Sequence, residues 1–158
     1  MSSTTAAPAA QPQEAPEINQ IAALPYRSSG PGADAPLEIL LVTSRGTGRW
    51  VLPKGNLSKR LSPAAAAARE AQEEAGLEGA IASAPMGAYR YHKLLDGGTT
   101  LLVEVDVYPL AVTGELDDWP ERAERERRWF TLGDAAAAVD EPDLRVLIQS
   151  FRSTAIPG

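Results

Sequence analysis

The sequence of 158 residues contains no cysteine and a single histidine, His92. It therefore has no disulfide framework, no thiolate nucleophile and no cysteine-ligated metal site, and this composition fits a reducing compartment. Acidic residues outnumber basic ones by 21 to 15, which gives a net charge of −6 and argues against nucleic-acid binding through a basic surface. No apolar run approaches the length of a membrane span. We expect a cytoplasmic protein that binds neither DNA nor a membrane, and the composition leaves its oligomeric state open.

The length of the chain suits one domain with a sizeable core. Hydrophobic residues make up 44% and charged residues 23%, which is an ordinary globular mixture. Residues 1–17 are rich in proline, alanine and glutamine and lack the basic and apolar regions of a secretion signal. We predict a disordered N-terminal tail over 1–17, a domain over 18–153 and a short C-terminal tail over 154–158.

The order of apolar runs and helix signals predicts a mixed α/β fold. Strands are predicted at residues 18–27, 37–44, 50–53, 81–95 and 99–110. Helices are predicted at residues 62–76, 132–140 and 142–153. Pro85 marks the true start of the fourth strand. This order favours a mixed sheet with helices packed against it.

The segment 62–76 carries the clearest helix signal. Ser62 is the N-cap candidate, Pro63 occupies the first helical position, and Gly76 is a natural stop. Alanine, glutamate and glutamine favour the helix between these ends. A small apolar face, which would let the helix lie close against a sheet, is predicted from Ala64, Ala68, Ala71 and Ala75.

Three carboxylates occupy a neighbouring face of this helix. At about 100° per residue, Glu70, Glu73 and Glu74 share one arc about 100° wide. They repel one another, and Arg69 is the one basic residue in the helix after Pro63. A divalent cation would remove the repulsion, and all-oxygen ligands select Mg²⁺ or Mn²⁺. The alternative is a solvated acidic face balanced by charges elsewhere in the protein.

A basic segment precedes the acidic one. Five basic residues and no acid lie between Ser44 and Arg60: Arg45, Arg49, Lys54, Lys59 and Arg60. The guanidinium and ammonium groups of Arg45, Arg49, Lys54 and Lys59 match phosphate oxygens, so they are candidates for binding a polyphosphate chain. Solvated loop charge is the alternative. Gly55 begins a loop that enters the helix, where backbone groups can approach a ligand or metal.

Together these residues resemble the Nudix box, which reads Gly, five residues, Glu, seven residues, then Arg-Glu-aliphatic-x-Glu-Glu-x-Gly-aliphatic. Gly55 is followed after thirteen residues by REAQEEAGL at 69–77. The ninth defined position, usually glutamate, is Leu61. The other eight positions are filled by Gly55, Arg69, Glu70, Ala71, Glu73, Glu74, Gly76 and Leu77.

Residues outside the box resemble one branch of the family. The segments 49–55, 107–121 and 127–130 are similar to the branch of diphosphoinositol and diadenosine polyphosphate phosphohydrolases. Bacterial members of that branch often carry leucine where Leu61 stands. The resemblance implies a Nudix fold, an α/β/α sandwich around a mixed sheet, and metal-dependent hydrolysis of a phosphoanhydride bond in a small phosphorylated substrate.

The resemblance also implies a metal site. Glu70, Glu73 and Glu74 would hold one or more Mg²⁺ ions, with Mn²⁺ as an alternative. The backbone carbonyl of Lys54 or Gly55 could add a ligand. The number of ions is left open.

Further roles follow from the same resemblance. Arg69 would orient a box glutamate. Glu73 or Glu74 would accept the proton as water attacks phosphorus, with Glu115 or Asp117 on a later loop as alternatives. Further substrate contacts, by analogy with basic residues that precede the Trp-Phe pair in the eukaryotic enzymes, are assigned to Arg125 and Arg127.

The substrate itself is not specified by these residues. Besides diphosphoinositol and diadenosine polyphosphates, a broader pyrophosphatase acting on nucleotide sugars, RNA 5′ ends or oxidised nucleotides fits the same box. A catalytically silent Nudix domain that only binds a ligand is a third interpretation, and the intact Glu70, Glu73 and Glu74 count against it.

Overall fold

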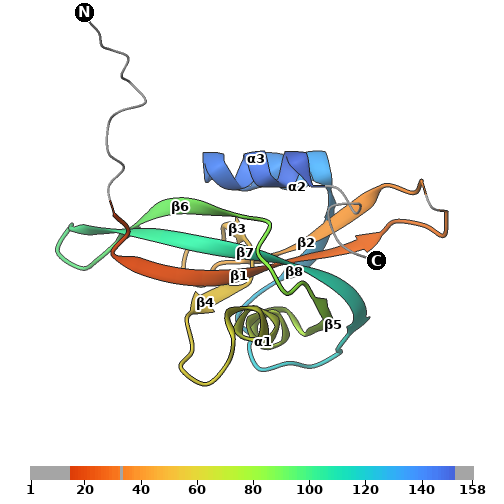
Figure 1. Cartoon of the computed structure of the whole chain (residues 1–158), viewed down its shortest axis with the longest axis horizontal. Coiled ribbons are helices and arrows are strands. Elements are labelled where there is room, and N and C mark those ends of the chain that lie inside the picture. Colours follow the sequence, from red (N-terminus) through yellow and green to blue (C-terminus); the bar gives the residue numbers. More distant parts are fainter. Residues whose placement is uncertain (1–14, 33, 152–158) are drawn as a thin grey trace, which may run out of the picture.

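The computed structural model describes residues 15–32 and 34–151 (Figure 1). Most of the N-terminal tail predicted over 1–17, and the whole C-terminal tail predicted over 154–158, lie outside these residues. Along the chain the elements are β1 (Ile18–Ser28), β2 (Leu37–Thr43), β3 (Trp50–Val51), β4 (Lys54–Asn56), α1 (Pro63–Ala75), β5 (Leu77–Ile81), β6 (Gly87–Leu94), β7 (Thr100–Glu115), β8 (Arg127–Thr131), α2 (Leu132–Ala138) and α3 (Pro142–Ser150).

The strands form one mixed sheet of eight strands. β1 and β7 run parallel at its centre, in a register that begins at Ile18 opposite Val103. All the other pairings among the described strands are antiparallel. The order β3-β2-β1-β7-β5 forms the main path, while β4 pairs with β1, β6 with β7 and β8 with β2. The mixed sheet predicted from the sequence is confirmed.

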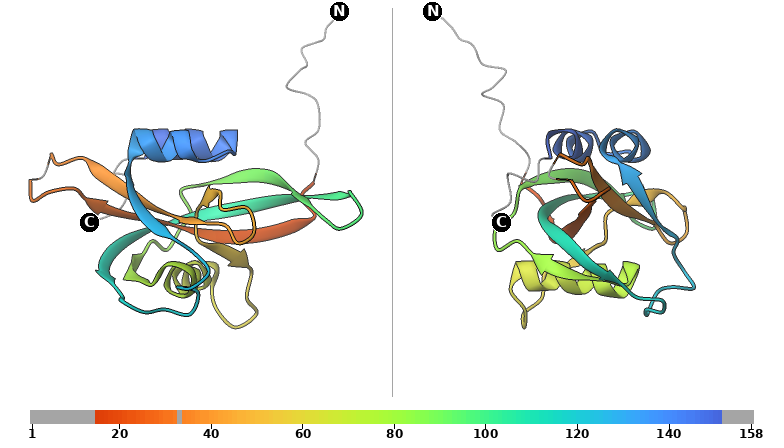
Figure 2. Two further views of the ribbon diagram at one scale, coloured as in Figure 1. Left: turned by 180° about the vertical axis from the view of Figure 1, so that it is seen from behind. Right: turned by 90° about the vertical axis from the view of Figure 1, so that its right-hand side faces the viewer.

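Helices cover both faces of the sheet. In Figures 1 and 2, α1 lies on one face, and α2 and α3 lie together on the other. Alternating strand residues supply a separate core to each side: on β2, Leu40 packs with the alanines of α1, whereas Leu41 packs with Leu144 and Ile148 of α3. This three-layer arrangement is the α/β/α sandwich expected from the resemblance.

The ends of α1 follow the capping signals. The Ser62 hydroxyl accepts a hydrogen bond from the Ala65 backbone N–H at 3.1 Å, and Pro63 is the first helical residue. Gly76 ends the helix in the left-handed region at φ 66° and donates its N–H to the Gln72 carbonyl at 3.0 Å. The predicted helix is confirmed at both ends.

The predicted apolar face of α1 is only half right. Ala71 and Ala75 are buried as expected, but Ala64 and Ala68 are half-buried. The fully buried alanines nearer the N-terminus are Ala66 and Ala67. The helix is rotated so that Glu74 also faces inward, where its carboxylate meets the backbone of Lys54.

Three short strands are absent from the sequence expectations. β4, β5 and β8 each have at most five residues, and each exists through pairing with a longer neighbour rather than through its own pattern. β7 continues past the predicted end at residue 110 to Glu115, because β5 pairs with this extension. Among the described helices, none is both long and apolar enough to span a bilayer.

Candidate active site

Two of the three α1 carboxylates lie together beneath the loop that enters the helix. Glu70 faces Gly55 so closely that an ideal Cβ at residue 55 would lie 2.5 Å from the Glu70 Cδ atom. Only glycine leaves room for this carboxylate beside the backbone of β4. Glu74, one turn further along α1, accepts a hydrogen bond from the backbone N–H of Lys54 at 3.3 Å.

Glu74 is the buried acid of the site. Its residue exposure is 6%, and its Oε2 atom lies 3.7 Å from Nη2 of Arg125, whose side chain is almost equally shielded. Arg125 is held in place by Glu121, with Nε and Oε1 2.6 Å apart, and by the backbone carbonyl of Thr43 at 3.1 Å. A fixed guanidinium therefore stands beside the buried carboxylate.

Burial controls the protonation of this carboxylate pair. Burial raises the pKa of Glu74 to about 8; the charge of Arg125 opposes the rise, and the charge of Glu70 adds to it. Burial also raises the pKa of Glu70, while a hydrogen bond with Glu74 acts in the opposite direction and the charge of Glu73 raises it further. Ionisation of both carboxyls at once is therefore disfavoured unless a cation is bound.

Glu73 does not join this pair. Its carboxylate is half-exposed and lies 3.9 Å from Nε of Arg69, one turn back on α1. Within residues 15–32 and 34–151, no three acidic or histidine side chains are grouped as a preformed metal-binding cluster. The arrangement therefore separates Glu73 and Arg69 from the buried pair of Glu70 and Glu74.

The donor set fits a hard divalent cation. Glu70 and Glu74 offer carboxylate oxygens, the ligands that Mg²⁺ prefers, and the narrow space at Gly55 brings backbone close to Glu70. Burial raises the pKa of both carboxyls, and a bound cation would offset the cost of ionising them.

A pocket of about 410 Å³ opens beside Glu74. Five of its lining residues are basic, and they come from the loop after β2, from β4, from β6 and from the segment before β8. The lining consists of Ser44, Arg45, Arg49, Val51, Leu52, Lys54, Glu74, Lys93 and Arg125. A buried carboxylate at the edge of a cationic pocket is suited to a phosphorylated ligand that also meets a metal ion.

Several predicted substrate residues thus come together in space. Arg45, Arg49, Lys54 and Arg125 all line the pocket. Lys54 also places its ammonium 5.1 Å from the centre of the Tyr91 ring.

Arg127, predicted to contact the substrate, contacts the backbone at the C-terminal end of α1. Its Nη1 atom donates to the Ala75 carbonyl at 2.7 Å, and its Nη2 atom donates to the Leu116 carbonyl at 2.8 Å. The guanidinium also stacks 4.0 Å from the centre of the Trp119 ring. Trp119 in turn donates its indole N–H to the Glu74 carbonyl at 3.0 Å. Arg127 and Trp119 therefore satisfy the carbonyls at the C-terminal end of α1.

Three other predicted residues lie apart from the pocket lining. Lys59 is exposed on the loop before α1. Glu115 forms an ion pair with Arg27 at 3.3 Å, and Asp117 is exposed. On the later loop, the acid that approaches the carboxylate pair is Glu121, which raises the pKa of both Glu70 and Glu74.

Lys93 and Glu121 are residues of the site that the sequence did not identify. Lys93 reaches the pocket from β6 because that strand pairs with β7, in a register that places Lys93 opposite Leu101. Glu121 is placed by its backbone N–H, which donates to the Glu73 carbonyl at 3.1 Å. Neither contact has a local sequence signal.

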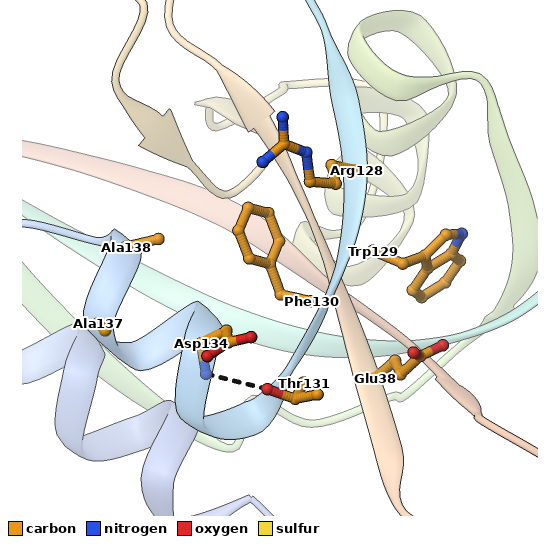
Figure 3. Close-up of a pocket in the computed structure, with 8 residues that line it drawn as sticks. All are labelled: Glu38, Arg128, Trp129, Phe130, Thr131, Asp134, Ala137 and Ala138. Carbon is orange, nitrogen blue, oxygen red and sulfur yellow. Dashed lines mark hydrogen bonds between the residues drawn. The ribbon is translucent and has the colours of Figure 1, made fainter.

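A second hollow, of about 460 Å³, lies elsewhere, along β8 and α2. Figure 3 shows its lining: Phe130 and Trp129 project to opposite sides of the strand, and Asp134 donates its backbone N–H to the Thr131 hydroxyl. It contains none of the α1 carboxylates and only one basic side chain, Arg128. We therefore assign the candidate site to the pocket beside Glu74.

Comparison with known proteins places these features in a family. The NUDIX domain model matches residues 21–151. Nudix hydrolase 12, mitochondrial, of Arabidopsis thaliana is 37% identical over 107 residues, which cover 63% of this chain and 50% of that protein. Human diphosphoinositol polyphosphate phosphohydrolase 3-beta is 36% identical over 101 residues, covering 62% of this chain and 57% of that protein. The chain spans about half to two thirds of the length of the curated relatives it matches.

Solved structures share the fold. An Ap4A hydrolase from C. elegans in a binary complex superimposes with a TM-score of 0.62 at 20% identity, covering 87% of this chain and 97% of that one. The NUDIX domain of Shewanella oneidensis NrtR, solved with ADP ribose, superimposes with a TM-score of 0.58 at 18% identity, covering 91% of this chain and 90% of that one.

Proposed function

The chain belongs to the Nudix family, and from this premise we propose that it is a Mg²⁺-dependent phosphohydrolase. Its substrate would be a diphosphoinositol polyphosphate or a diadenosine polyphosphate, in which it cleaves a phosphoanhydride bond. The observation that carries the proposal is the buried carboxylate Glu74, beside Glu70, at the edge of a pocket lined by five basic side chains. A cytoplasmic location remains a prediction from the sequence.

Glu70 and Glu74 would hold the metal, with the backbone carbonyl of Lys54 or Gly55 as a further ligand. When bound, Mg²⁺ neutralises charge on phosphate oxygens and makes attacking water more acidic. Mn²⁺ has the same preference for oxygen ligands and could substitute. The raised pKa values of Glu70 and Glu74 support their assignment as metal ligands, because a cation would favour the charged forms of both carboxyls.

Glu73 is the proton acceptor we favour. It lies next to the buried pair in sequence but is half-exposed, and its one ion pair among the described residues is the 3.9 Å contact with Arg69. This leaves its carboxylate able to accept a proton as water attacks phosphorus. Arg69 would hold Glu73 in orientation, and Glu74 is the alternative acceptor.

The basic pocket would bind the phosphate chain. Arginine forks match pairs of phosphate oxygens, and lysine contributes a compact charge. Clustered phosphates fit a lining that combines Arg45, Arg49, Lys54, Lys93 and Arg125. The name of the human relative supports an inositol-based substrate, and that of the C. elegans structure supports a dinucleoside substrate.

The test is a comparison of turnover with Mg²⁺ on a diphosphoinositol polyphosphate and on a diadenosine polyphosphate. Glu74→Gln should reduce kcat by about 100-fold or more, because it removes a charged metal ligand. Glu78→Gln is the matched control, since Glu78 is an exposed glutamate on β5 outside the pocket lining. The ratio of kcat/KM values would identify the preferred substrate.

Two results would contradict the proposal. One is the absence of turnover on both substrates by folded protein with Mg²⁺, which would move the assignment to a broader pyrophosphatase or to a domain that only binds its ligand. The other is a Glu74→Gln variant as active as the control.

A further inference from the structure

Arg49 is shared by two neighbouring carboxylates that differ in exposure. Its Nη1 atom lies 3.0 Å from Oδ2 of Asp140 and 3.5 Å from Oε2 of Glu141. The Asp140 side chain is 66% exposed, whereas that of Glu141 is 10% exposed. One guanidinium at the pocket therefore has an outer partner open to solvent and an inner partner shielded from it.

The pairing with Arg49 is the one interaction of the Glu141 side chain that the described contacts include. It stands at the N-cap of α3, but its side chain makes no capping hydrogen bond. Its Oε1 atom is buried and accepts no hydrogen bond within the described part of the chain. A buried, half-satisfied carboxylate is costly, and its described ion pair is with Arg49.

The inner side of this cluster lies against the core. Burial raises the pKa of the Tyr89 phenol, the charge of Glu141 raises it further, and the charge of Arg49 opposes the rise. Tyr89 is 1% exposed, so the charge of Glu141 acts on a phenol inside the core, and the Glu141 side chain is itself only 10% exposed. A substrate phosphate that enters from solvent therefore meets the exposed Asp140 before the shielded Glu141.

We propose that Glu141 is a positioning residue that anchors Arg49 from below, and that Asp140 is a competing carboxylate which a substrate phosphate displaces from the same guanidinium. The proposal rests on the proposed function, because it assumes that clustered phosphates occupy this pocket. It makes the two adjacent acids act in opposite directions: Glu141 strengthens polyphosphate binding and Asp140 weakens it.

Arg45 provides the internal comparison. Its Nη1 atom lies 2.9 Å from Oε1 of Glu124, and both side chains are about half-exposed. No buried second carboxylate holds Arg45 among the contacts the structure describes. Among the described ion pairs, Arg45 thus has an exposed carboxylate partner but no buried one, whereas Arg49 has one of each.

The experiment measures equilibrium binding of inositol hexakisphosphate by calorimetry at low salt. This probe carries clustered phosphates but no phosphoanhydride bond, so binding is read without turnover. Asp140→Asn should lower Kd about twofold to fivefold, or about 0.4–1 kcal/mol, because the variant frees Arg49 from an exposed ion pair. Glu141→Gln should raise Kd about fivefold, because Arg49 then loses its fixed orientation and must be ordered on binding.

Arg49→Gln completes the double-mutant cycles. In the Arg49→Gln background, neither Asp140→Asn nor Glu141→Gln should change the Kd of the probe, because each acts through the Arg49 guanidinium. Asp143→Asn is the matched control: Asp143 is an exposed acid on the first turn of α3, and the same change of charge there should leave Kd unchanged. With a turnover substrate, Glu141→Gln should raise KM while kcat stays within about twofold.

The outcomes separate this proposal from the proposed function. If wild-type protein binds the probe and both acid variants tighten binding equally, with or without Arg49, the acids act only through net charge and the anchor is wrong. If wild-type protein does not bind the probe, the pocket does not bind clustered phosphates, and the proposed role of Glu141 is contradicted as well. If Glu141→Gln lowers Tm too far to measure, the Asp140 cycle decides, because its gain must vanish without Arg49.

Discussion

Gly55 lies directly against the carboxylate of Glu70, so that an ideal Cβ at residue 55 would come within 2.5 Å of Glu70 Cδ. The strand β4, which carries Gly55, is held in place by pairing with β1. The position of the carboxylate is therefore set by the absence of a side chain on a neighbouring strand.

Gly55→Ala should displace Glu70 while leaving the fold intact. We expect kcat/KM with Mg²⁺ to fall about 10- to 100-fold, because small displacements of catalytic groups are costly. The free energy of unfolding should change by less than about 1 kcal/mol, because the crowded atoms belong to the end of a flexible side chain that can move aside. Gly133→Ala is the control, since a Cβ at Gly133 in α2 meets no atom within 4 Å; it should keep full activity. Equal activity of both variants would exclude the proposed role of this contact.

Glu74→Gln should stabilise the protein in the absence of divalent ions. The substitution replaces a carboxyl whose ionised form burial disfavours with a neutral amide, and we expect a gain in the free energy of unfolding of about 1–3 kcal/mol, or about 3 °C in Tm for each kcal/mol. Wild-type protein should gain stability when Mg²⁺ is added, because a ligand that binds only the folded state stabilises it. The variant should not. Thermal unfolding with EDTA and with Mg²⁺ measures both effects, and a Mg²⁺ response that survives in Glu74→Gln would argue against Glu74 as a ligand.

Asp106 on β7 should make stability fall as pH rises. Burial, and then the charge of Glu104, raise its pKa above the ordinary 3.8, so the folded state binds this proton more tightly than the unfolded state does. The protonated Asp106 carboxyl contributes its full share to the free energy of unfolding below about pH 3.8, and this contribution is lost as pH rises through the raised pKa. Asp106→Asn removes this loss, so its gain in stability over wild type should be larger at about pH 7 than at about pH 3. Urea unfolding at the two pH values tests this, with Asp96→Asn, in the exposed turn after β6, reporting the effect of losing an exposed carboxyl.

Arg127→Gln should act on stability rather than on substrate affinity. The variant leaves the carbonyls of Ala75 and Leu116 without their donor, which should cost about 1–3 kcal/mol. Because Arg127 does not line the pocket, the salt dependence of KM should match that of wild type. Arg45→Gln should show the reverse: nearly unchanged Tm, a raised KM and a weaker salt dependence. If the salt dependence of KM were weaker in Arg127→Gln than in wild type, Arg127 would instead contact the substrate.

The sequence by itself determined the helix and the residue types of the site. The N-cap at Ser62, the proline that follows it and the stop at Gly76 are local signals, and the structure follows all three. The spacing of the box residues also identified the family, because eight matched positions combined are far more specific than any one of them. The mixed sheet followed from the order of apolar runs.

Only the tertiary structure decided which of these residues meet. Helical spacing treats Glu70, Glu73 and Glu74 as one face, but packing against β4 buries Glu74 and leaves Glu73 half-exposed beside Arg69. Lys93 enters the pocket through strand register, and Arg49 meets Glu141 across 92 positions of sequence. A local pattern fixes backbone propensity and residue type, whereas the burial and partners of a charge depend on segments that only the folded chain brings together.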